Sequence, residues 1–275
     1  CFVTGVQTCA LPILAKNNWS NVGRSFEGVL IKNKRPFGEM LAFSLPIIES
    51  KEAYHNDQKD TWLNGLYFKY DLPGLNNNSV AEIYIMDFQD STAALSYSTY
   101  GGRVDGGINS FTLESEYALQ SSENISAKLL SINLGYKPAN NGFMKKMGLG
   151  LDFLSGDDTS TVEMEGFSKY FGARHKYHGF YDYTKHKKFM DHAHEGLREF
   201  NLKWNFNFLF NTNLLVALHD FTSGDGNTHY GQEMDLIFKK SISDELSLEQ
   251  GIAFYKPNDD DSILNFVYLM LTASL

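Results

Sequence analysis

The segment from Glu199 to Phe210 alternates between apolar and polar residues almost without interruption. One set of alternate positions is apolar and mostly aromatic, and it comprises Phe200, Leu202, Trp204, Phe206, Phe208 and Phe210. The other set is polar apart from Leu209, and it comprises Glu199, Asn201, Lys203, Asn205 and Asn207. Because successive side chains of a β-strand point to opposite faces, the segment predicts a strand with one apolar and one polar face. Its length matches the roughly 9–11 tilted residues with which a β-strand crosses a bilayer, so we predict lipid on one side and water on the other.

Similar strand-like segments recur along the chain, separated by clusters of Gly, Asn, Asp and Ser. The predicted strands are Phe26–Lys32, Phe37–Leu45, Trp62–Asp71, Val80–Phe88, Thr92–Tyr100, Ile108–Leu119, Ser126–Lys137, Lys146–Leu154, Leu197–Phe210, Leu214–Phe221, Gly231–Lys239, Leu246–Tyr255 and Ile263–Leu275. We find no convincing amphipathic helix of useful length between them. The pattern therefore predicts an all-β fold, a transmembrane antiparallel β-barrel with about 13–14 strands in this sequence.

The composition agrees with strands that dilute apolar residues one for one with polar ones. The chain has 275 residues, of which 43% are hydrophobic, and its mean hydropathy is −0.31. No stretch approaches the roughly 18 apolar residues of a membrane helix. The net charge of −9 argues against nucleic acid as a partner, because nucleic-acid binding needs a basic surface. We find no linker of low complexity, so we expect residues 14–275 to form one barrel domain.

The first residues have a different origin from the rest. Val3–Ile13 reads VTGVQTCALPI, which resembles the translation of a common sequencing adapter, and we interpret residues 1–13 as an artefact rather than native protein. Both cysteines, Cys1 and Cys9, lie inside it, so we expect no disulfide or thiol chemistry. We also expect the true N-terminus, with its signal peptide and opening strands, to be missing from this sequence.

Several stretches, taken in order, resemble the alginate-export family of outer-membrane barrels. They are Trp19–Val29, Tyr100–Gln120, Leu129–Pro138, Lys145–Asp158, Phe171–Tyr183 and Gly231–Pro257. The combination of SGD, RHKYHGFYD and GxExDL is more specific than any of these pieces alone. The resemblance implies an eighteen-stranded barrel in the outer membrane whose lumen passes an anionic polysaccharide.

A lumen that conducts a polyuronate is expected to carry cations, and arginine suits this role because its guanidinium meets a carboxylate bidentately and stays charged. The predicted pathway residues are Arg24, Arg103, Arg174, Lys176 and Lys203, with Asp152, Glu199, Glu233 and Asp235 as their counter-charges. Lys203 is placed inward by strict alternation, and the resemblance implies the three arginines. Arg198 shares the parity of Phe200, so its side chain could instead extend to the membrane boundary. The alternative is that these charges form ordinary structural ion-pair networks of a wet lumen.

Other polar clusters are interpreted as loops rather than as sites. Asp191, His192, His194 and Glu195 could ligate a transition metal, but they lie in a lysine-rich polar segment that is more typical of a solvated loop. The acidic stretches at 155–158 and 258–261 have no regular ligand spacing and are interpreted as turns. We expect no metal or other cofactor. No Ser/His/Asp grouping or phosphate loop indicates an enzyme.

Turn lengths predict an orientation in which short links are periplasmic and long loops extracellular. The links at Asn211–Asn213 and Ile242–Glu245 are short, whereas Thr222–Tyr230 and Asn258–Ser262 are expected outside. Ala173–Tyr183 breaks this parity if it spans the membrane. Either it belongs to a long extracellular excursion folded over the mouth, or the strand count is wrong nearby.

The function expected from these observations is passive transport through an outer-membrane channel of the alginate-export type. Its expected partners are outer-membrane lipid, an anionic polysaccharide, and periplasmic proteins that the sequence does not identify. Two alternatives remain open at this point: a general or small-solute porin, and a plugged barrel that binds a surface glycan. Fold alone does not choose between them.

Overall fold

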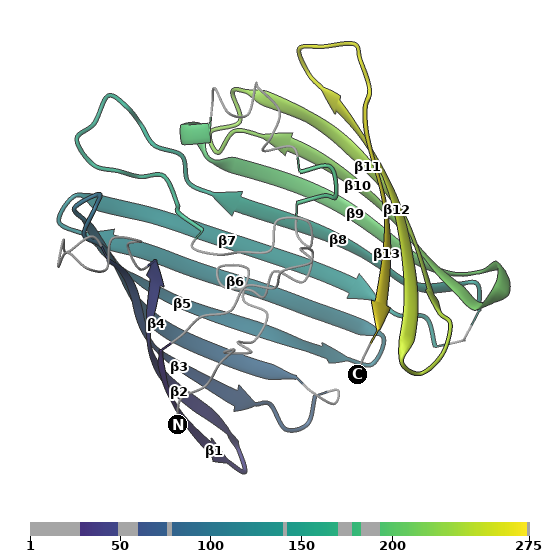
Figure 1. The fold of residues 1–275 in the computed structure, drawn as a ribbon, viewed down its shortest axis with the longest axis horizontal. Helices are drawn as coiled ribbons and strands as arrows, with labels where there is room; N and C mark the ends of the chain where they lie inside the picture. Colours follow the sequence, from purple (N-terminus) through teal and green to yellow (C-terminus); the bar gives the residue numbers. More distant parts are fainter. Residues whose placement is uncertain are drawn as a thin grey trace. The chain divides into compact units, whose positions relative to one another are not determined.

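The computed structural model describes residues 28–48, 60–75, 79–139, 142–169, 178–182 and 193–273 (Figure 1). They form 13 antiparallel strands in one sheet, and each strand pairs with the next strand in the sequence. The strands are β1 (Val29–Arg35), β2 (Gly38–Ile48), β3 (Thr61–Asp71), β4 (Val80–Asp90), β5 (Leu95–Ile108), β6 (Phe111–Ser122), β7 (Ile125–Tyr136), β8 (Met144–Leu154), β9 (Leu197–Phe208), β10 (Thr212–Thr222), β11 (His229–Ser241), β12 (Leu246–Pro257) and β13 (Leu264–Ala273). The prediction of an all-β antiparallel fold is confirmed.

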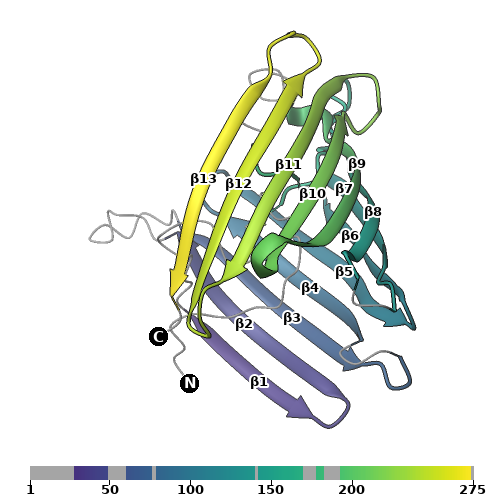
Figure 2. The ribbon, with the colours of Figure 1, turned by 90° about the vertical axis from the view of Figure 1, so that its right-hand side faces the viewer.

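The chain divides into two compact units, each described by itself. One unit draws on Cys1–Gly106, Ser115–Leu130 and Asp157–Ala173, and it contains β1 to β4. The second draws on Gly107–Glu114, Ser131–Gly156 and Arg174–Leu275, and it contains β8 to β13. Figure 2 shows β9 to β13 of the second unit running side by side with a common tilt. In the part of the chain that the structure describes, no helix is long and apolar enough to cross a membrane.

Several predicted strand boundaries differ from the observed ones, and the largest error is at β5, predicted as Thr92–Tyr100 and observed as Leu95–Ile108. Two further errors lie at tight turns. Ile108 was predicted to begin a strand but ends β5, because Asn109 adopts a left-handed conformation with φ of 53° and reverses the chain one residue later. Phe210 was predicted to continue the apolar face of β9, but it has φ of 57° in a short 3₁₀ turn, Leu209–Asn211. The turn before β10 therefore comes two residues earlier than predicted. Asn tolerates such backbone angles better than most residues.

The predicted alternation is visible in the burial of the strands of the second unit. On β9, Glu199 and Asn201 are buried while Phe200 between them is 47% exposed. On β10, Ala217 and His219 are buried and Leu218 is exposed. The polar set therefore lies on the covered face and the apolar set on the exposed face. This distribution is the reverse of a soluble sheet packed on an apolar core, and it is the one expected for strands with lipid outside.

Three glycines lie opposite aromatic residues on the neighbouring strand, and the space above each glycine is occupied by the aromatic ring. The cross-strand pairs are Phe43 with Gly65, Tyr84 with Gly101, and Gly251 with Tyr268. In each pair a Cβ on the glycine would overlap the ring of its partner. Such pairs let a large ring lie flat over the neighbouring strand, and they help to fix the register of the pairing.

Replacing Gly251 with Ala is expected to destabilise the second unit by about 1–3 kcal/mol, because the ring of Tyr268 must move from its position. Gly102→Ala is the matched control, since a Cβ there would lie 3.5 Å from its nearest neighbour, the carbonyl oxygen of Glu82. Urea-induced unfolding of the protein inserted in lipid vesicles measures the stability of both variants. Equal stability of the two would contradict the assigned register of β12 and β13.

Candidate functional site

The covered face of β8 to β11 brings charged residues from four strands into adjacent rows. Asp152 of β8 pairs with Glu199 of β9. In the next row His219 of β10 lies between Asn201 and Glu233, and in the row after it Ala217 lies between Lys203 and Asp235. Because neighbouring strands lie about 4.8 Å apart, side chains in these rows are within reach of one another.

A short turn, residues 178–182, folds onto this face and completes a group that we term the acid–histidine cluster. Its members are Asp152, His178, Glu199, His219, Glu233 and Asp235. All six side chains are buried, and Glu199 and Asp235 are fully so. Charged groups are buried at this density only where they compensate one another.

Glu199 lies at the centre of the cluster and joins the turn to the sheet. Its Oε2 contacts Nδ1 of His178, which comes from the turn. Its Oε1 lies 2.6 Å from Nδ1 of His219 and 3.3 Å from the Asn201 amide that donates to it. On the far side of the same imidazole, Nε2 of His219 lies 3.4 Å from Asp235. A single carboxylate thus holds one histidine of the turn and one histidine of the wall, our term for the sheet of strands β8 to β13.

The 178–182 turn makes further contacts with β11, β12 and β13. The backbone N–H of Tyr181 donates to Oε1 of Glu233 at 2.7 Å. The ring of Tyr181 stacks on Tyr255, with centroids 5.0 Å apart and planes inclined by 9°. The ring of Phe180 stacks on Tyr268 at 5.8 Å. These contacts fix the turn against three further strands of the sheet.

Gly179 allows the turn to approach the wall so closely. Its φ of 80° lies in the left-handed region, which L side chains rarely adopt. A Cβ at this position would also lie 2.5 Å from the carboxyl group of Glu233. Both the backbone angle and the available space therefore require glycine here.

A second set of contacts ties together the loops beside the cluster. Arg198 donates to the carbonyl of Gly224 at 2.7 Å, and the N–H of Gly224 donates to the carbonyl of Glu195 at 2.8 Å. Hydrogen bonds from Ser223 and Asn227 hold the pKa of the exposed Asp225 carboxyl below its usual range. Arg198, whose side chain could have extended to the membrane boundary, therefore binds a loop carbonyl.

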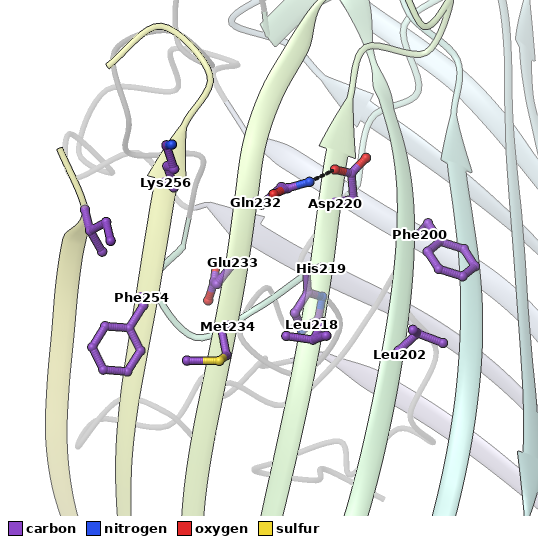
Figure 3. Close-up of a pocket in the computed structure, with 11 residues that line it drawn as sticks. Phe200, Leu202, Leu218, His219, Asp220, Gln232, Glu233, Met234, Phe254 and Lys256 are labelled. Carbon is purple, nitrogen blue, oxygen red and sulfur yellow. Dashed lines mark hydrogen bonds between the residues drawn. The ribbon is translucent and has the colours of Figure 1, made fainter. Parts of the chain in front are cut away.

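The other face of these strands carries an apolar groove, shown in Figure 3. Phe200, Leu202, Leu218, Met234 and Phe254 line it. At one end lie Asp220, Gln232 and Lys256, and Gln232 donates to Asp220 at 2.8 Å. An apolar band that ends in polar side chains is typical of a strand leaving the hydrocarbon layer.

The predicted site residues have different locations. Arg24, Arg174 and Lys176 lie outside the described residues. Arg103 is buried in the first unit, where it donates to Glu82 at 2.8 Å and to Asp105 at 2.6 Å. The remaining five lie on the covered face of the second unit; they are Asp152, Glu199, Lys203, Glu233 and Asp235.

The acidic residues were predicted as counter-charges of arginine and lysine, but three of the four contact histidines. Asp152 and Glu199 face His178, and Asp235 faces His219. Neither histidine was predicted. His219 shares the parity of the buried Ala217 and Phe221, so its inward position could have been read from the sequence. Nothing in the segment that contains His178 indicates that it reaches the wall.

Of the segment Ala173–Tyr183, the structure describes only residues 178–182, which form a turn and not a spanning strand. Strands β8 and β9, on either side of residues 155–196, are direct antiparallel neighbours. Both observations agree with a long excursion, and its extracellular location stays a prediction. The segment 191–195, interpreted as a solvated loop rather than a metal site, is described only at residues 193–195, a short 3₁₀ turn.

Comparisons with known proteins agree with this architecture. The family model described as alginate export matches residues 10–223. Among solved structures, the chain is similar to OccK11 (OpdR) of Pseudomonas aeruginosa, an outer-membrane porin barrel. The TM-score is 0.60 at 14% identity, and the match covers 96% of this chain and 73% of OccK11. No curated protein sequence matches.

Proposed function

Because the chain belongs to the alginate-export family, we propose that it is a passive outer-membrane channel for an anionic polysaccharide or a related solute. The observation that carries the proposal is the division of β9, β10 and β11 into an exposed face with Phe200, Leu218 and Met234 and a covered face with buried polar residues. A β-strand in lipid needs the first face, and a wet passage needs the second. The family supports the polysaccharide, and the porin fold supports the passage.

The charged residues of the covered face have two different roles. The carboxylates of the acid–histidine cluster are buried beneath the 178–182 turn, where they hold the turn rather than meet a solute. Lys203 is only half-buried and forms no ion pair with any residue in the described ranges. Lys203 is therefore available to a passing carboxylate, whereas these acids are covered by the turn. Arg103 is held by two carboxylates, so we assign it to the structural ion pairs of the first unit.

Replacing Lys203 with Glu is expected to shift ion selectivity towards cations and to weaken block by a polyuronate. A hydrogen bond to a charged group contributes about 1.5–3 kcal/mol, so block should need at least about tenfold more polyanion. Reversal potentials and single-channel block in a planar bilayer measure both effects. Lys240→Glu is the control, because Lys240 is exposed at the end of β11. Selectivity that stays unchanged in Lys203→Glu would remove Lys203 from the pathway.

A general small-solute porin is the second candidate, and the similarity to OccK11 favours it. The two functions differ in what blocks the current. A polysaccharide channel should be blocked by a polyuronate at concentrations at which neutral dextran has no effect. A general porin should be indifferent to both polymers.

A further inference from the structure

Three side chains with metal-ligand chemistry meet where the turn contacts the wall. They are Asp152 of β8, His178 of the turn and Glu199 of β9, and all three are buried. One ligand atom from each lies within 4.8 Å of the other two. Nδ1 of His178 contacts Oε2 of Glu199 and lies 3.8 Å from Oδ2 of Asp152.

We propose that these three residues bind a divalent transition-metal ion of the zinc class, which joins the turn to β8 and β9. One imidazole nitrogen and two carboxylate oxygens form a donor set that Zn²⁺ accepts, with a fourth position left for water. Ca²⁺ and Mg²⁺ prefer a shell of oxygen atoms alone, so the imidazole discriminates against them.

The surroundings of the trio are those of a supported metal site. His219 holds Oε1 of Glu199 at 2.6 Å, which leaves Oε2 directed towards His178. Asp235 in turn faces the other nitrogen of His219 at 3.4 Å. Outer partners of this kind fix the orientation of the ligands.

The charge of the cluster also favours a bound cation. Four buried carboxylates, those of Asp152, Glu199, Glu233 and Asp235, lie among two imidazoles. Oε2 of Glu233 and Oδ1 of Asp235 are buried and accept no hydrogen bond from the described part of the chain. A buried carboxylate is costly unless positive charge compensates it, and a dication beside Asp152 and Glu199 supplies that compensation.

The ion would hold the turn against the sheet, because it links His178 of the turn to residues of β8 and β9. If the protein is a channel, Zn²⁺ is expected to stabilise the arrangement in which the turn lies on the covered face of β8 to β12. This consequence rests on the proposed function, whereas metal binding itself does not.

The test is a Zn²⁺ titration of the folded full-length protein in competition with a chromophoric chelator. His178→Ala and Asp152→Asn are each expected to weaken Zn²⁺ binding by at least about 10–100-fold. Asp152→Asn keeps the shape of the side chain, so it also serves if His178→Ala does not fold. Amide exchange of residues 178–182 should slow on adding Zn²⁺ to the native protein and should not respond in either variant.

Other histidines provide the controls. His229 lies 2.9 Å from Asp220 outside the trio, so His229→Ala should bind Zn²⁺ like the native protein. The double variant His192→Ala, His194→Ala lacks the histidines that could compete for Zn²⁺, and it should also retain the site. Zn²⁺ binding that survives in His178→Ala and Asp152→Asn, or that disappears without His192 and His194, would overturn the proposal. Binding that depends on the trio in a protein without ion conductance would uphold the metal site and contradict the channel instead.

Discussion

Replacing Leu202 with Arg is expected to destabilise the protein folded in a bilayer by about 2–4 kcal/mol, the cost of a cation near the midplane on the lipid side of a barrel. Leu202 lies in the middle of β9 and lines the apolar groove. Its backbone pairs with Leu149 and Leu218 on the neighbouring strands, so lipid is the only medium that the new charge could meet there. The fraction of protein folded in lipid vesicles, measured as a function of urea concentration, gives the change in stability.

Asn205→Arg on the same strand is the matched control. Asn205 lies three positions after Leu202, and this odd spacing places it on the opposite, polar face of the strand. The same substitution there should change stability by far less, because water reaches the charge. Equal loss of stability in both variants would contradict the assignment of the two faces.

Replacing Glu199 with Gln is expected to release the 178–182 turn from the wall. Glu199 is fully buried and contacts both His178 and His219, and its amide analogue cannot accept from both in the same way. Breaking a buried charged pair costs about 3–5 kcal/mol, and here that cost falls on the contact between turn and wall. We expect faster amide exchange at Tyr181 and a larger single-channel current, both measured with a chelator present.

Asp220→Asn is the control for this prediction. Asp220 is also a carboxylate on a spanning strand and faces a histidine, His229, at 2.9 Å, but it lies away from the turn. Its replacement should leave the turn and the current unchanged. An intact, protected turn in Glu199→Gln would mean that Glu199 does not anchor it.

The strands were predictable from the sequence because their pattern is local. Each of the 13 predicted segments overlaps one observed strand, and the two faces of β9 follow from period two alone. The errors at Ile108 and Phe210 arise at turns, where one left-handed residue decides the boundary and the apolar pattern gives no signal. Alternation identifies a strand better than it identifies the end of a strand.

The position of the 178–182 turn could not be predicted, because it depends on contacts between residues far apart in the sequence. His178 meets Glu199 across 21 residues, and Tyr181 meets Glu233 across 52. The four acidic residues were predicted on the polar face from the pattern and the family motifs. Their partners were not, since a carboxylate accepts from histidine, a backbone N–H or arginine alike.

Single-channel current of the full-length protein in a planar bilayer, recorded with added polyuronate, neutral dextran or a polycation, tests the central claim most directly. An anionic-polysaccharide channel predicts open events that the polyuronate blocks selectively, with little effect of dextran. Open channels that are indifferent to all three polymers would contradict the polysaccharide and leave a general porin. The lack of any current would contradict the channel itself and favour a plugged barrel that binds a glycan.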